Sequence, residues 1–357
     1  MNNIDTPTGQ SEKLNTKSWL LFFIFFILVL IFVIYYFNEI KKDLLLLKKV
    51  NFYWLILAII AQILTYFFTA IIYRLLIRAC KLKQMPRLSD VFEASIIAQF
   101  FNQVIPGAQL SGNTFIFNFL IKLRIGAVQV VSLILTELLT FYAAMEITTL
   151  LLLSACLSIY KVPNAFEITL GAGAVVYLVF GFLVALAGRK KFLNILYGKI
   201  TKIKIIKKWF QNINNSINKS KVSNNDIQLP VFLKRNKKPV AEAFTCQIFV
   251  IASDALTIYA LFNGLGITVS PYTILLGLVS TKIISTLPFL PGALILYESS
   301  MSFFFVSLGV PLGPAIMITL LYRLLSFWFP IPVGLFLYRR WLQRPAVPFN
   351  SPTSRIT

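Results

Sequence analysis

Six runs of about 20 or more apolar residues decide what this 357-residue chain can fold into. A helix needs about 20 apolar residues to cross a hydrocarbon core of roughly 30 Å. The runs occupy 19–37, 52–73, 127–157, 166–187, 240–262 and 313–338. Only 13% of the residues are charged, against about 25% in soluble domains. The pattern predicts an all-α, polytopic integral membrane protein with about six full spans.

Two further apolar stretches are interrupted by residues that break helices. The breaking residues are Pro106 and Gly107 in the stretch 91–121, and Pro288, Pro291 and Gly292 in the stretch 271–308. Such breaks free backbone groups that hydrocarbon cannot hydrogen-bond, so they are tolerated only against protein or water. Each stretch is therefore predicted to form a re-entrant helical hairpin or a pair of short spans, which brings the total to about eight apolar elements.

The two broken stretches belong to an internal repeat. Pro106-Gly107-Ala108 matches Pro291-Gly292-Ala293, and Glu137 and Arg323 follow these glycines by 30 and 31 residues. Each unit reads as span, hairpin, span, and the number of crossings between the units predicts that they are inverted. Inverted repeats with discontinuous helices are typical of secondary transporters. The alternative is a scaffold whose helices were merely duplicated.

Basic residues predict the topology and the domain limits. Fourteen Lys and Arg against one acid, Asp226, lie between Arg189 and Lys238, and such clusters mark cytoplasmic loops. The predicted parts are a cytoplasmic tail (1–17), a membrane domain (18–340) containing repeat 1 (about 52–157), a basic cytoplasmic loop (188–239) and repeat 2 (about 240–338), and a second cytoplasmic tail (341–357).

The basic loop also predicts a partner. Apolar residues recur at steps of three and four over 196–217, with lysines mainly between them, so an amphipathic helix is expected to lie on the anionic inner leaflet. A solvated basic linker is the alternative. In so apolar a chain, the net charge of +21 points to this leaflet and not to nucleic acid. The oligomeric state is left open.

Charged residues within the membrane segments are the candidate functional residues. A charge at the bilayer centre costs at least about 2.5–3.5 kcal/mol, so such residues usually pair or line a pathway. Glu137 and Arg323 occupy equivalent repeat positions and are expected to pair, or to flank the substrate path together. A purely structural ion pair is the alternative. The other charged residues in these segments are Glu93, Glu146, Asp254, Lys282 and Glu298.

Residues around the breaks predict a phospholipid-head-group site. Glu298 could accept a proton or contact an amine or hydroxyl group, and Lys282 could meet a phosphate as a point charge. Three amides, Asn102, Gln103 and Asn113, could bind substrate or satisfy the broken backbone. The chain has no histidine, which excludes imidazole catalysis and histidine-bound zinc, and its three cysteines form no metal motif. We therefore predict no cofactor, no metal site and no catalytic residues.

The second break carries a resemblance to a known family. The residues concerned are 287–292 (LPFLPG), Glu298, Gly309-Val310 and 321–330 (LYRLLSFWFP), with a counterpart at Asn102, Pro106-Gly107, Gly112 and Glu137. They resemble the lysylphosphatidylglycerol synthase transmembrane-region family, the flippase-like domain of the multiple peptide resistance factor, without the synthase domain. The resemblance covers about 15–340. It implies a multi-pass protein of the bacterial or archaeal cytoplasmic membrane that moves a lipid or lipid-linked molecule between leaflets.

Some positions depart from the family pattern. Tyr297 stands where a basic residue is usual, Asn113 where an acidic one is usual, and Leu138 where arginine is common. The family's substrate is therefore not carried over. The expected function is flippase-like transport. The alternatives are a membrane-embedded aminoacyl- or glycosyl-lipid transferase and a non-catalytic envelope scaffold.

Overall fold

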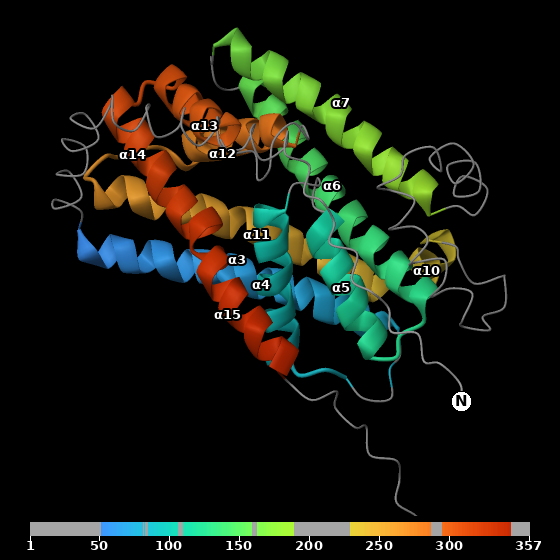
Figure 1. Ribbon diagram of the computed structural model, residues 1–357. Coiled ribbons are helices and arrows are strands. Elements are labelled where there is room, and N and C mark those ends of the chain that lie inside the picture. Colours follow the sequence, from blue (N-terminus) through green and yellow to red (C-terminus); the bar gives the residue numbers. More distant parts are fainter. Residues whose placement is uncertain are drawn as a thin grey trace, which may run out of the picture. The chain divides into compact units, whose positions relative to one another are not determined.

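The computed structural model describes residues 51–80, 82, 85–105, 110–158, 163–188, 229–286 and 295–343, all within the unit Val50–Thr357. The regular structure in these ranges is helical (Figure 1). In chain order the helices are α3 (Phe52–Ala79), α4 (Leu88–Val104), α5 (Leu110–Lys122), α6 (Ala127–Ser158), α7 (Asn164–Ala187), α10 (Leu229–Arg235), α11 (Lys237–Gly264), α12 (Pro271–Ser285), α13 (Leu296–Ser307), α14 (Leu312–Arg323), the π-helix η2 (Leu324–Trp328) and α15 (Pro330–Gln343).

Five of the described helical segments are long and apolar enough to cross a membrane. They are α3, α6, α7, α11 and the continuous segment Leu312–Gln343, which joins α14, η2 and α15. They correspond to five of the six predicted spans and confirm a polytopic helical membrane protein. The other predicted span, 19–37, lies outside the described residues, as do 1–17, the predicted amphipathic helix at 196–217, and the end of the C-terminal tail.

Each broken stretch forms two short helices in place of one span. Helices α4, α5, α12 and α13 have 17, 13, 15 and 12 residues. None reaches the roughly 20 residues that a full crossing requires, which favours a re-entrant hairpin. The turns themselves fall outside the described residues, and with them Pro106, Gly107, Pro288, Pro291 and Gly292.

The first hairpin is closed by a glycine. The Gly112 N–H donates to Asn102 Oδ1 at 2.7 Å, and a Cβ added at Gly112 would lie 2.4 Å from the Ala98 carbonyl oxygen. Helices α4 and α5 therefore approach so closely that a side chain has no room between them. Asn102 therefore satisfies a backbone N–H of the hairpin, which is one of the two roles that the sequence leaves open for it.

We expect Gly112→Ala to destabilise the protein by about 1–3 kcal/mol, the usual cost of overpacking, because the added methyl group would push α4 away from α5. Gly171→Ala is a matched control, because a Cβ at this position on α7 has nothing within 4 Å. Thermal unfolding of the two variants in detergent measures the difference. Equal melting temperatures would show that the hairpin does not depend on this contact.

The first helices of the two repeats, α3 and α11, lie side by side in opposite directions (Figure 1). The Asn51 N–H donates to the Gly264 carbonyl at one end, the Thr65 hydroxyl donates to Asp254 in the middle, and the Phe68 and Phe249 rings stack further along. Because each helix precedes its own hairpin, their antiparallel packing agrees with the expected inversion of the repeats.

The two hairpins pack into different apolar clusters. The first cluster combines α4 and α5 with the C-terminal part of α3, and includes Leu76, Ile97 and Ile116. The second combines α12, α13 and α14 with the C-terminal part of α11, and includes Ile258 and Phe305. The other apolar face of the second hairpin packs against α6 and α7. The middle of α3 lies between these clusters, and polar side chains gather there.

Candidate functional site

Two buried ion pairs form the centre of the candidate site. Arg323 Nε lies 2.6 Å from Glu298 Oε1, which joins α14 to α13, and the two side chains are 7% and 22% exposed. Lys282 Nζ lies 2.6 Å from Asp254 Oδ2, which joins α12 to α11. Burying an unpaired charge costs several kcal/mol, so each of these residues depends on its partner.

Aromatic rings cover the guanidinium group of Arg323. Its Cζ lies 4.6 Å from the centre of the Tyr297 ring and 4.2 Å from that of Phe327. The Tyr322 ring stacks on Tyr297 at 6.2 Å, and the two phenol groups are hydrogen-bonded. Ring faces attract a desolvated guanidinium. Tyr297 and Phe327 therefore hold the Arg323 side chain in place.

Asp254 connects the second ion pair to the first repeat. Its Oδ1 accepts a hydrogen bond from the Thr65 hydroxyl of α3 at 3.0 Å, while Oδ2 accepts from Lys282. The carboxylate therefore has a donor on each oxygen. This arrangement links α3, α11 and α12 at one point.

The π-helix η2 presents two backbone carbonyls to the first repeat. In η2 the Phe329 N–H donates to the Leu324 carbonyl, five residues back. The Tyr66 hydroxyl of α3 donates to the Leu325 carbonyl at 2.8 Å, and Gln103 Nε2 of α4 donates to the Ser326 carbonyl at 3.1 Å. Short π-helical insertions occur frequently at functional sites. The part of the first hairpin next to its turn therefore contacts the second repeat.

Three buried oxygens of this network have no hydrogen-bond partner in the described part of the chain. They are Glu298 Oε2, Gln103 Oε1 and Gln62 Oε1. The Gln103 amide nitrogen donates to the Ser326 carbonyl. The Gln62 amide interacts with the Tyr66 oxygen, and the Tyr66 hydroxyl donates its own hydrogen to the Leu325 carbonyl. All three remaining atoms are therefore acceptors. The site can bind groups that carry N–H or O–H donors.

A family model described as Lysylphosphatidylglycerol synthase TM region matches residues 18–334. The chain belongs to this family. The match covers most of the chain and confirms the resemblance drawn from the motifs around both breaks. No curated protein matches the chain.

In this lysylphosphatidylglycerol synthase transmembrane-region protein, the predicted residues divide into two groups. Four lie in the network described above: Arg323, Glu298, Lys282 and Gln103. Asn102 serves the first hairpin, and Asn113 is partly buried on α5.

The expected pairing of Glu137 with Arg323 is wrong. Arg323 pairs with Glu298 of its own repeat, and Glu137 is hydrogen-bonded to Gln247 of α11. Glu137 also interacts electrostatically with Tyr73, which lies about two helical turns along α3 from Tyr66. The two equivalent positions therefore lie in different environments.

Gln62 and Tyr66 were not predicted as site residues, whereas Asp254 is among the charged membrane residues that the sequence singles out. One signal points to the first of them. Gln62 and Gln247 are 185 residues apart, the same separation as Gly107 and Gly292. Gln247 of repeat 2 interacts with Glu137 of repeat 1, and Gln62 interacts with Tyr66 within repeat 1. The two glutamines therefore occupy equivalent positions on α3 and α11, and each meets a polar or charged side chain.

Proposed function

We propose that this family member is a flippase-like transporter that moves a lipid or lipid-linked molecule between membrane leaflets. The observation that carries the proposal is the buried polar network. Side chains of both antiparallel repeats build it, and the short helices of both broken hairpins contribute to it. A purely structural core would not require paired charges and unpaired acceptors at the same place.

The inverted repeats suggest how such a site could face both leaflets. One unit used in two orientations gives two related conformations, which open to opposite sides. Helix α13 of the second hairpin carries Glu298, so movement of this hairpin relative to α14 would separate Glu298 from Arg323. A head group with hydroxyl or ammonium donors would then satisfy the carboxylate in place of the arginine.

Reconstituted vesicles test the proposal. Purified protein in liposomes containing a fluorescent phospholipid or lipid-linked sugar is expected to expose the inner-leaflet label to a membrane-impermeant quencher faster than protein-free liposomes do. Mass spectrometry of the lipids recovered after an aminoacyl or glycosyl donor is added separates transport from the transferase alternative, because only a transferase would then change the mass of the lipid. If every candidate lipid stays in its leaflet, the transport proposal fails.

A further inference from the structure

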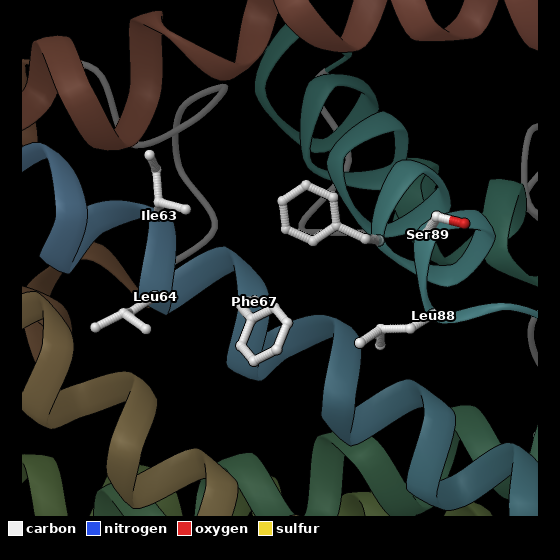
Figure 2. Close-up of a pocket in the computed structure, with 6 residues that line it drawn as sticks. Ile63, Leu64, Phe67, Leu88 and Ser89 are labelled. Atoms are coloured by element: carbon white, nitrogen blue, oxygen red, sulfur yellow. The ribbon is translucent and has the colours of Figure 1, made fainter.

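An apolar groove runs between α3 and α4. It has a volume of about 470 Å³ and is lined by Ile63, Leu64 and Phe67 of α3 and by Leu88, Ser89 and Phe92 of α4. Figure 2 shows these side chains on the two facing helices. The volume lies within the range of roughly 300–1,000 Å³ that is typical of ligand sites.

The groove leads to arginines along one face of α3. Ile63, Phe67, Arg74 and Arg78 follow one another at steps of four, seven and four residues, which places them on the same side of the helix. Both arginines are exposed. Arg87, also exposed, directly precedes Leu88, where α4 begins at one end of the groove.

One acidic residue of α4 lies near this side of the helix. Glu93 follows Ser89, which lines the groove, by four residues but is partly buried, whereas Asp90 is offset in the helical period from Leu88, Ser89 and Phe92. The three exposed arginines outnumber this acid. The surface thus combines an apolar channel with three exposed guanidinium groups at one end. Guanidinium groups bind phosphate with paired hydrogen bonds.

The dimensions fit one membrane leaflet. The helical rise places Arg74 about 16 Å from Ile63 along α3. Half of a hydrocarbon core of roughly 30 Å is about 15 Å. A chain lying in the groove would therefore span one leaflet, with its head group level with the arginines.

We propose that this groove binds one acyl chain of an anionic phospholipid, whose phosphate contacts Arg74, Arg78 and Arg87. The charge at the end of the groove selects an anionic lipid over a zwitterionic one. Each arginine near an anionic lipid surface contributes about 1 kcal/mol, or about fivefold in binding. The site stands independently of the proposed leaflet exchange, because it uses none of the residues of the polar network.

The Phe67→Trp variant tests this site in reconstituted vesicles. Tryptophan fluorescence is quenched by lipids with brominated acyl chains, and the signal of the native protein with its five tryptophans is subtracted. Brominated phosphatidylglycerol is expected to quench the tryptophan introduced in the groove at a concentration at least about fivefold lower than brominated phosphatidylcholine. Adding Arg74→Gln, Arg78→Gln and Arg87→Gln should remove this preference.

Phe303→Trp is the matched control, because Phe303 is an exposed aromatic residue on α13, in the other hairpin. The tryptophan introduced there should be quenched equally by both lipids. Equal quenching of the groove tryptophan in Phe67→Trp would overturn the proposal, and so would a preference that survives the three arginine substitutions. No quenching of the groove tryptophan by either lipid would mean that protein covers the groove, which also overturns it.

Native mass spectrometry provides a second test of the groove. Anionic phospholipid should copurify with the natural chain and be lost from the variant that carries all three arginine substitutions. Equal amounts of bound anionic phospholipid on the two proteins would contradict the assignment of Arg74, Arg78 and Arg87 as the phosphate contacts.

Discussion

Arg323→Ala is expected to reduce leaflet exchange by more than about tenfold, because it leaves the Glu298 carboxylate buried without its partner. Breaking a buried pair in this way costs about 3–5 kcal/mol of folding free energy. A tenfold loss of exchange requires only that about 1.4 kcal/mol of this cost falls on the transport site. Exchange of a fluorescent lipid in vesicles measures the loss. The Tyr297 and Phe327 rings would also lose the cation that they cover.

Two controls separate the role of Arg323 from a general effect of removing charge. Arg340→Ala removes an exposed arginine from α15 and should leave exchange unchanged. Arg323→Lys keeps the charge but loses the planar guanidinium, so we expect partial activity. If the Arg323→Ala protein is folded and exchanges lipid at the natural rate, the site is wrongly assigned.

Lys282→Met is expected to lower the stability of the folded protein by about 3–5 kcal/mol, because Asp254 is 4% exposed and would lose its cation. Thr65 would remain as the described donor to this carboxylate. The yield of monodisperse protein and its melting temperature in detergent measure the effect.

The double variant Lys282→Met with Asp254→Asn removes both charges, so it should recover much of the lost stability. Lys238→Met is the matched control, since Lys238 is exposed near the start of α11. A melting temperature for Lys282→Met equal to that of this control would show that the ion pair contributes nothing to the fold.

The five described spans could be predicted from the sequence because their apolar runs are long and contain few charges. The run 52–73 stops at the first arginine, whereas helix α3 continues to Ala79 and includes Arg74 and Arg78. Arginine is a good helix former whose charged end reaches water at a membrane surface, so hydropathy underestimates the length of such a helix.

The division of both broken stretches into short helices could also be predicted, but the pairing of the charges could not. Which partner Arg323 takes depends on which side of α14 faces α13. The repeat alone favoured Glu137 as the partner of Arg323, because the two residues occupy equivalent positions in the two repeats. The π-helix at Leu324–Trp328 was not visible in the sequence either, because Tyr66 and Gln103 from distant helices bind its carbonyls.

Leaflet exchange by the double variant Arg323→Met with Glu298→Gln distinguishes a transport site from a purely structural ion pair. This variant removes both buried charges together, so the protein should fold and keep its melting temperature within a few degrees of the natural chain. If the ion pair belongs to a transport site, exchange should fall to the level of protein-free vesicles. Exchange at the natural rate by the folded double variant would contradict the account, because the pair would then be structural only.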